Sequence, residues 1–413
     1  LKGESGSEVE VRIERPHGGG ILDLMVERAK VRVPAVTYSG MLNDSTGYIY
    51  LAKFTRGSAG EVRKALMSLR DSAGMKQLVF DLRGNGGGLL KESVSIVNLF
   101  VPKGTEIVST RGKSENWNKS YKALGRPTAE DMPLVVLIDG KSASASEIVS
   151  GTLQDLDRAV IVGMESFGKG LVQQTKDMAF NTRLKVTVAK YYTASGRCIQ
   201  RLDYGGKRDA QGKARAVSDT LLRTFETKGG RPVIEGRGIQ PDIALETPFM
   251  STWLQRLLDE YQVFYYATQV AAGLDSTDVP DPVSFALSDA DWDQFLEHLK
   301  EAEFEYDTES MVVLEELGNV VELEQYQGVA EESLAALRSA LEPNLERDLG
   351  LFEQEIRQTL EDEVVLRFHY AAGMVERSLT KDPTVGRALE VFGEEMTSVL
   401  GEGVPSESAP TRE

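Results

Sequence analysis

Short apolar runs alternate with amphipathic segments between residues 47 and 241. Runs typical of β-strands occupy residues 48–54, 78–82, 134–138, 159–163 and 184–192. Apolar residues recur at helical spacing in residues 58–70, in the segment that starts at Leu90, and in residues 144–156. Strands that alternate with helices predict an α/β (α+β) core, in which a mixed sheet is flanked by helices. Residues 203–236, rich in Gly, Lys and Arg, are expected to form an inserted loop or hairpin.

The pattern changes at both ends of this core. Residues 1–34 contain two short strand patterns separated by a run of glycines, and residues 251–400 carry no strand signal. Apolar residues from Leu345 to Phe368 keep helical spacing over about six turns, which predicts one long amphipathic helix. We therefore expect an N-terminal segment (1–34), a core (35–250), an all-helical extension (251–400) and a disordered tail (401–413).

Charge is divided along a similar boundary. The 413-residue chain has a formal net charge of −17. Residues 291–413 hold 30 acidic and 9 basic residues, a net charge of −21, which leaves 34 acidic and 38 basic residues, a net charge of +4, in residues 1–290. The acidic balance argues against general nucleic-acid binding. Because no run of 18 apolar residues is present, the sequence predicts no transmembrane helix.

Cysteine and histidine are scarce. A single cysteine, Cys198, excludes an internal disulfide and a cysteine-rich zinc site. The three histidines, His17, His298 and His369, leave residues 18–297 without any, so a histidine-built metal centre and a Ser-His-Asp triad both lack candidates. We expect no metal site.

Two glycine-rich segments imitate nucleotide-binding loops. Residues 163–170 (GMESFGKG) match a phosphate-binding P-loop except at the last position, where Gly170 replaces the Ser or Thr that holds Mg²⁺. A strand pattern follows instead of a helix, which weighs against ATP binding. Residues 84–89 (GNGGGL) lack the last glycine of a dinucleotide fingerprint, but such a turn at a helix start presents backbone N–H groups to an anion.

Residues 141–147 (KSASASE) join a buried strand to a helix, and two interpretations apply to Ser144. Ser144 with Glu147 forms a capping box, which is the usual role of a serine at such a junction. Alternatively, Ser144 is a nucleophile at a helix N-terminus, where the helix dipole favours an alkoxide and the N–H of Ala145 faces an oxyanion.

A serine nucleophile needs a base, and Lys169 is the candidate. A lysine can act as a base when burial lowers its pKa towards neutrality. Lys169 lies between two glycines just beyond a buried strand. Alternatively, Lys169 is a surface lysine on a glycine turn.

These segments together resemble the C-terminal processing peptidases, also called tail-specific serine proteases. The matching motifs are residues 81–88 (DLRGNGGG), 142–147 (SASASE), 167–173 (FGKGLVQ), 191–197 (YYTASGR) and 238–242 (GIQPD). Residues 3–16 resemble the last strand of the PDZ domain that precedes the catalytic core in this family. Residues 1–34 are therefore interpreted as the end of a PDZ domain whose beginning is missing.

The resemblance implies a role for each matching residue. Ser144 is the implied nucleophile, Lys169 the general base, and Gln173 the residue that orients the lysine. If Lys169 begins a helical turn, Gln173 at i+4 lies on the same face. The implied oxyanion hole is made by the backbone N–H of Ala145 and of a glycine in the 86–88 run, either Gly87 or Gly88. Ser142 and Ser146 are expected to support the site.

The resemblance also implies the setting. The expected substrates are unfolded or extended proteins with apolar C-termini, cleaved outside the cytoplasm, in the bacterial periplasm or cell envelope, without a cofactor. The acidic helical extension is either a solvated face or an arm for homo-oligomers or an adaptor. A non-catalytic peptide-binding scaffold of the same fold is the alternative function.

Overall fold

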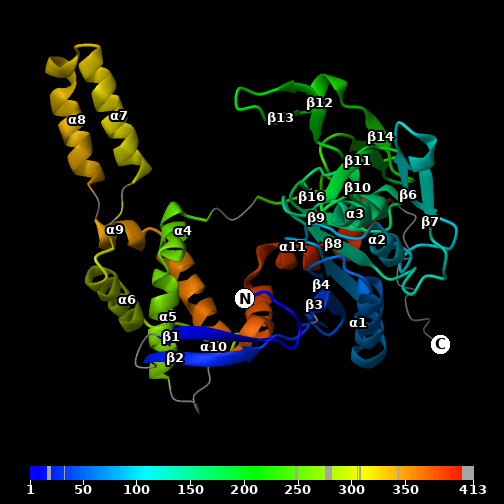
Figure 1. The fold of residues 1–413 in the computed structure, drawn as a ribbon, viewed down its shortest axis with the longest axis horizontal. Coiled ribbons are helices and arrows are strands. Elements are labelled where there is room, and N and C mark those ends of the chain that lie inside the picture. The colour runs from blue at the N-terminus through cyan, green and yellow to red at the C-terminus, as the bar shows by residue number, and fades with distance from the viewer. Residues whose placement is uncertain are drawn as a thin grey trace. The chain divides into compact units, whose positions relative to one another are not determined.

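The computed structural model describes residues 1–15, 20–31, 33–246, 250–274, 281–304, 306, 308–342 and 344–401. The chain forms two compact units: residues 31–247 with 379–413, here called the core, and residues 1–30 with 248–378, here called the helical unit. The expected fold class, a mixed α/β core with a C-terminal helical region, is confirmed (Figure 1). The expected tail lies outside the described residues from 402 onwards.

A six-stranded mixed sheet lies at the centre of the core. Its strands, in spatial order, are β16 (Ile243–Ala244), β9 (Val160–Gly163), β8 (Leu134–Ile138), β5 (Gln77–Asp81), β4 (Thr46–Leu51) and β3 (Val36–Met41). All neighbours are parallel except β3 and β4. Parallel strands are buried on both faces, which explains why they appear in the sequence as continuous apolar runs.

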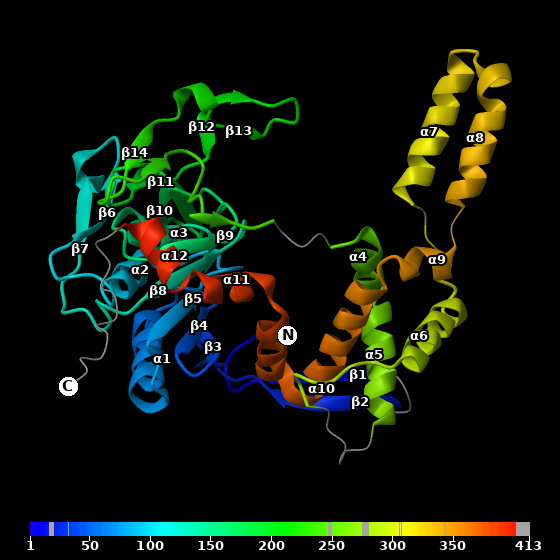
Figure 2. The ribbon, with the colours of Figure 1, turned by 180° about the vertical axis from the view of Figure 1, so that it is seen from behind.

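Alternate side chains of these strands pack on opposite faces of the sheet. On one face, Leu78 and Phe80 belong to an apolar cluster with the buried sides of α1 (Ser58–Ala73), α2 (Leu90–Val97) and α3 (Ala145–Asp155). On the other face, Val79 and Val135 pack with α11 (Pro383–Val391) and α12 (Glu394–Leu400), as Figure 2 shows from behind. Residues 379–400, expected in the helical extension, therefore complete the core.

A second sheet and two hairpins extend the core. The sheet is antiparallel, in the order β10 (Leu171–Asp177), β11 (Arg183–Tyr192), β6 (Glu106–Arg111) and β7 (Lys119–Lys122). The insertion expected at residues 203–236 forms hairpins β12–β13 (Leu202–Arg208, Ala214–Ala216) and β14–β15 (Thr224–Glu226, Pro232–Ile234). Short 3₁₀ turns lie at Glu115–Trp117 and Asp219–Leu221.

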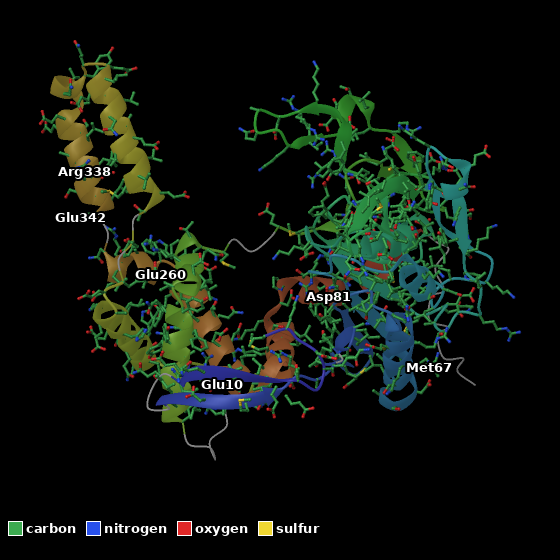
Figure 3. All side chains as sticks on the ribbon, in the orientation of Figure 1. Glu10, Met67, Asp81, Glu260, Arg338 and Glu342 are labelled. Atoms are coloured by element: carbon green, nitrogen blue, oxygen red, sulfur yellow. The ribbon has the colours of Figure 1, made fainter. Side chains whose placement is uncertain are left out.

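The helical unit has its own apolar core. Strands β1 (Glu8–Arg15) and β2 (Gly20–Glu27) form an antiparallel hairpin. The helices are α4 (Thr252–Asp259), α5 (Gln262–Gly273), α6 (Asp289–Glu301), α7 (Glu309–Leu323), α8 (Gln327–Leu341), α9 (Leu345–Gly350) and α10 (Glu353–Lys381). Side chains of the α7–α8 hairpin project outward, and only Leu314 is buried (Figure 3). None of the described helices is long and apolar enough to cross a membrane.

The single long helix expected over residues 345–368 is wrong. Helix α9 ends at Gly350, α10 begins at Glu353, and the backbone of α10 leaves helical conformation at Tyr370, where φ is 54°. The apolar stripe is nevertheless buried, since Leu349, Ile356 and Leu360 lie in the core of the helical unit. Glycine is a poor helix former, so a break after Gly350 costs little while the stripe continues across it.

The packing of α11 on the sheet yields a matched pair of substitutions. Ala388 is fully buried against the sheet, whereas a Cβ at Gly386, two residues away, would meet open space. Ala388→Asp should cost several kcal/mol of unfolding free energy, because it buries an unpaired charge, whereas Gly386→Asp should be close to neutral. Thermal unfolding of the two variants checks this. Equal melting temperatures would show that α11 does not cover the sheet in solution.

Candidate active site

Ser144 occupies the sharp turn between β8 and α3. It is the N-cap of α3, with φ 57° and ψ −105°, a sparsely populated conformation with positive φ that costs a non-glycine residue about 1–3 kcal/mol. Its N–H donates to Glu147 Oε2 (2.7 Å), and its carbonyl accepts the N–H of Ile148 (2.9 Å). The predicted link between Glu147 and the start of the helix is thus present, and it holds Ser144 in a strained conformation.

The carboxylate of Glu147 also binds the segment that carries Lys169. Its Oε1 accepts the hydroxyl of Ser166 (2.6 Å) and the N–H of Gly168 (2.7 Å), and its Oε2 accepts the N–H of Lys169 (2.9 Å). Glu147 is fully buried. Burial raises the pKa of Glu147, and the four hydrogen bonds oppose that rise. One carboxylate therefore fixes the backbone at both Ser144 and Lys169.

This role of Glu147 was missed by the sequence analysis. A capping box explains the contact with Ser144, three residues away, and carries no signal for contacts with residues about 20 positions further along the chain. Only the adjacency of β8 and β9 in the sheet brings the two loops together.

The glycine-rich loop at residues 84–88 packs directly against Ser144. The amide of buried Asn85 donates to the carbonyl of Leu51 (2.7 Å) and accepts the N–H of Gly87 (2.9 Å). Its backbone carbonyl accepts the hydroxyl of Ser146 (2.7 Å) and the N–H of Ala143 (3.0 Å). Asn85, which the sequence analysis did not single out, therefore connects the loop to the start of α3.

Glycine is required at two positions of this loop. Gly87 has a φ of 94°, and a Cβ there would lie 2.9 Å from the nitrogen of Ala145 and 3.0 Å from the Cβ of Ser144. Gly88 has a φ of 155°, and a Cβ there would lie 2.2 Å from the carbonyl oxygen of Phe54. Side chains at these positions would push the loop away from Ser144.

Two backbone N–H groups beside Ser144 are unused. The N–H of Gly87 is bonded to Asn85. By contrast, the N–H groups of Ala145 and Gly88 have no hydrogen-bond partner among the described residues. Of the two glycines predicted for an oxyanion hole, Gly88 therefore has the free donor.

Lys169 and Gln173 differ from expectation in their local structure. Lys169 lies in an irregular segment, and strand β10 begins two residues later, so the helical turn considered for residues 169–173 is wrong. A β-bulge between Val172 and Gln173 shifts the register of β10 against β11. The side chain of Lys169 is exposed rather than buried, and no hydrogen bond joins it to Ser144 within the described residues.

A cavity of about 770 Å³ nevertheless gathers the predicted residues. Ser144, Lys169, Gln173, Gly87 and Gly88 all line it. Ala145 is buried directly behind Ser144. Thus five of the six predicted site residues border one space, and the sixth contributes the first N–H of α3.

An ion-pair network ties the glycine-rich loop to the C-terminal helices. The Nη2 atom of Arg83 lies 2.6 Å from Asp81 Oδ2 and 2.7 Å from Asp382 Oδ2. Asp382 caps α11 by accepting the N–H groups of Thr384 and Val385. The side chain of Asp81 is buried within the core (Figure 3). Arg83 immediately precedes the loop, so α11 is fixed to its base.

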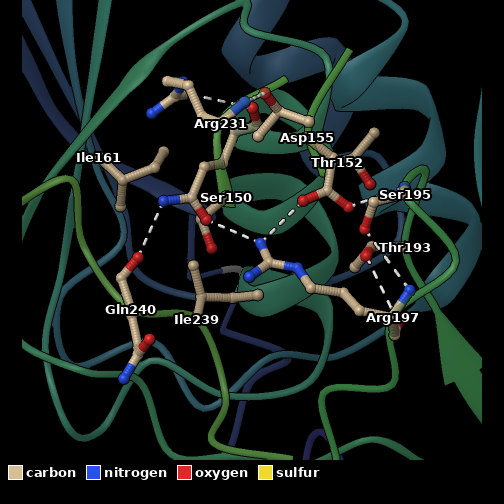
Figure 4. A network of polar contacts seen from close by, with 12 residues as sticks. Ser150, Thr152, Asp155, Ile161, Thr193, Ser195, Arg197, Arg231, Ile239 and Gln240 are labelled. Atoms are coloured by element: carbon tan, nitrogen blue, oxygen red, sulfur yellow. Dashed lines mark hydrogen bonds and ion pairs between the residues drawn. The ribbon is translucent and has the colours of Figure 1, made fainter. Parts of the chain in front are cut away.

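A buried network fixes the other end of α3 (Figure 4). Arg197 Nη2 donates to Gln154 Oε1 (2.7 Å) and pairs with Asp155 (2.8 Å). Arg231 pairs with Asp242 (2.5 Å), which also binds the amide of Gln154 (2.8 Å). The motifs at residues 191–197 and 238–242 thus meet at the C-terminal end of the helix that carries Ser144.

Rival chemistries find little support in the geometry. The segment 163–170 leads into strand β10 and not into the helix that a phosphate-binding loop requires. Within the described residues, no cluster of His, Cys, Asp and Glu is arranged to hold a metal ion.

Two segments of the chain match models of known protein families. Residues 45–209 match the model of peptidase family S41, and residues 253–392 match the family described as probable PDZ-protease, C-terminal helical domain. A carboxy-terminal-processing protease of Bartonella bacilliformis is 39% identical over 203 residues, 48% of this chain and 46% of that protein. A probable CtpA-like serine protease of Staphylococcus aureus is 31% identical over 250 residues, 60% of this chain and 42% of that protein. The chain spans less than half the length of these curated relatives.

Among solved structures, the photosystem II D1 C-terminal processing protease is 28% identical, with a TM-score of 0.39, and covers 59% of this chain and 57% of that one. The match to the model of peptidase family S41 includes the segments around Ser144 and Lys169. On these matches, residues 45–209 resemble peptidase family S41, and residues 253–392 resemble the helical domain described for probable PDZ-proteases.

Proposed function

We propose that the chain is a serine endopeptidase that cleaves proteins near their C-termini, with Ser144 as nucleophile and Lys169 as general base. One observation carries the proposal: Ser144, Lys169, Gln173 and the glycine-rich loop border one cavity, and a single buried carboxylate binds the backbone of both reacting residues. The names of the relatives agree with this activity.

The chemistry follows from these positions. Lys169 Nζ takes the proton of the Ser144 hydroxyl, and Oγ attacks the carbonyl carbon of the scissile peptide bond. The N–H groups of Ala145 and Gly88 stabilise the resulting oxyanion. The C–N bond breaks as the leaving amine takes the proton from Lys169. Lys169 then deprotonates a water molecule, which hydrolyses the acyl-enzyme and restores Ser144. Gln173 orients the lysine.

Catalysis in this scheme requires a movement of Lys169. Its backbone is fixed by Glu147, while its side chain is exposed and makes no bond to Ser144. Lys169 already lines the cavity, so its four-carbon side chain has to rotate towards Ser144 within a space from which a bound substrate excludes water. In the proposed mechanism, the Ser-Lys hydrogen bond forms when the substrate is bound.

The setting of the enzyme is proposed from its relatives. Extended protein substrates with apolar C-termini, cleaved in the bacterial periplasm or cell envelope, suit a tail-specific protease. The hairpin β1–β2 is the proposed end of a PDZ domain, and the helical unit is the proposed arm for self-association or an adaptor. The exposed, unbonded Lys169 favours one alternative, a non-catalytic peptide-binding scaffold of the same fold.

A covalent serine probe separates the two functions. The wild-type chain should react with a fluorophosphonate and cleave an unstructured protein, whereas Ser144→Ala should lose labelling and at least about 10³-fold of the activity. Ser150→Ala, in the same helix, should keep both. A wild-type chain that neither reacts nor cleaves would leave the scaffold as the function.

The substitution Glu147→Gln tests whether Glu147 positions Ser144 for reaction or only stabilises the fold. An amide has one acceptor oxygen and cannot receive four hydrogen bonds, so we expect a loss of about 1–3 kcal/mol in stability and a 10- to 100-fold slower labelling of Ser144. Glu92, which binds Gly57, Ser58 and Ala59 at the start of α1, is the matched control. Glu92→Gln should reduce stability but keep the labelling rate. Equal labelling of both variants would contradict the positioning role.

Asp382→Asn tests the link between α11 and the glycine-rich loop. Asparagine is a good N-cap, so the helix start is kept while the ion pair with Arg83 is lost. We expect kcat to fall about three- to tenfold with KM unchanged, because the loop carries the Gly88 donor. Arg387→Gln, which removes the Arg387–Glu395 pair elsewhere on α11, should leave kcat unchanged. An unchanged kcat in Asp382→Asn would mean that Asp382 only caps α11 and does not position the loop.

A further inference from the structure

The cavity at Ser144 is lined by lysines and by no carboxylate. Its charged lining residues are Lys53, Lys169 and Lys185. A second cavity of about 920 Å³ adjoins it, since Gly86, Lys169, Leu171 and Gln173 line both. The two cavities form one cleft, with Ser144 on its wall.

The two halves of this cleft differ in chemistry. The second cavity is lined by large apolar side chains, namely Phe167, Leu171, Leu202 and Tyr204. It also carries Lys141 and Lys190, with Asp203 as its single carboxylate. The first cavity, here called the lysine pocket, has Leu171 and Tyr191 as its only large apolar side chains. One half therefore suits an apolar side chain, and the other suits a negative charge.

The lysines of the pocket are available to a ligand. The side chains of Lys53 and Lys185 are exposed, and neither is paired with a carboxylate within the described residues. They come from different elements, since Lys53 follows β4 and Lys185 lies in β11. Residues 1–290 carry a net charge of +4, and two unpaired cations beside Ser144 add a local positive charge to the cleft.

We propose that the lysine pocket binds a carboxylate of the substrate, held by Lys53 and Lys185 while an apolar residue of the same peptide fills the adjoining cavity. The proposal rests on the proposed peptidase function and adds a selection for negative charge near the scissile bond. The carboxylate comes either from a Glu or Asp side chain or from the free C-terminus of the substrate. Both have the chemistry that two ammonium groups recognise.

The exposure of Lys53 and Lys185 limits how strongly they can favour an acidic peptide. Exposed ion pairs contribute little each, so the two lysines together should favour an acidic over a neutral peptide by about three- to tenfold in kcat/KM. The preference should shrink at high salt, because the screening length falls from about 10 Å at 0.1 M to about 3 Å at 1 M.

The test compares matched peptides with the full chain. Each set has three peptides that share one apolar residue and differ at one other position, which holds Glu, Gln or Lys. Successive sets move this position along the peptide, and every peptide is made as a C-terminal acid and as an amide. The wild type should cleave the Glu series or the C-terminal acids with the higher kcat/KM, and the two arms identify the source of the carboxylate. Equal kcat/KM for all peptides would overturn the proposal.

Substitutions assign the preference to the pocket. In a Lys53→Gln, Lys185→Gln double variant, the ratio of kcat/KM for the preferred acidic peptide to its neutral partner should fall towards one. A Lys185→Glu variant should favour the Lys peptide. A Lys176→Gln, Lys207→Gln control removes two exposed lysines outside both cavities and should keep the wild-type ratio. An unchanged ratio in the first double variant would also overturn the proposal.

The outcome distinguishes this proposal from the proposed function. If the wild type cleaves none of the peptides and Ser144 does not react with a fluorophosphonate, the peptidase function itself fails. If the wild type cleaves them all and shows no dependence on charge, only the carboxylate pocket fails.

Discussion

The arrangement of the site depends on the buried carboxylate of Glu147. Two loops that leave neighbouring strands, β8 and β9, carry Ser144 and Lys169, and each loop donates backbone N–H groups to this one side chain. A buried charge with four donors is costly to disturb, because loss of any partner leaves a polar group without compensation. The hydrogen bond to Glu147 holds Ser144 in its strained backbone conformation. The side chains of Ser144 and Lys169 can therefore move while their backbone attachment stays fixed.

The sequence predicted the parts whose signals are local. Strand β8 falls on residues 134–138 as expected, and α3 begins one residue after Ser144, because continuous apolar runs and capping residues mark such elements. Contacts between distant segments were not predictable in this way. The bonds from Glu147 to the segment at residues 166–169, the connections of Asn85 and the pair of Arg83 with Asp382 all join residues that are far apart in the sequence. The helical turn expected after Lys169 failed because pairing with β11 makes that segment a strand.

The position of Lys169 in the sequence did not predict the exposure of its side chain. Its place between glycines after a buried strand suggested a base shielded from water, but the hairpin β10–β11 beyond it is largely exposed. Spacing along a chain identifies which residues can meet, whereas exposure depends on what covers them. The cations around the cleft were similarly hidden in the near-neutral charge of +4 of residues 1–290, because Lys53, Lys141 and the pair Lys185 and Lys190 come from three separate segments.

The cover that α11 and α12 give to the central sheet has a consequence for biosynthesis. The strands of that sheet are complete at Ala244, yet one of their faces stays uncovered until residues 383–400 have left the ribosome. During translation of the intervening 138 residues, Val79, Val135 and Leu137 have no partner on that side. A nascent chain in this state exposes an apolar surface and is a good client for chaperones. The order of segments along the chain thus leaves this apolar face uncovered until both helices have been made.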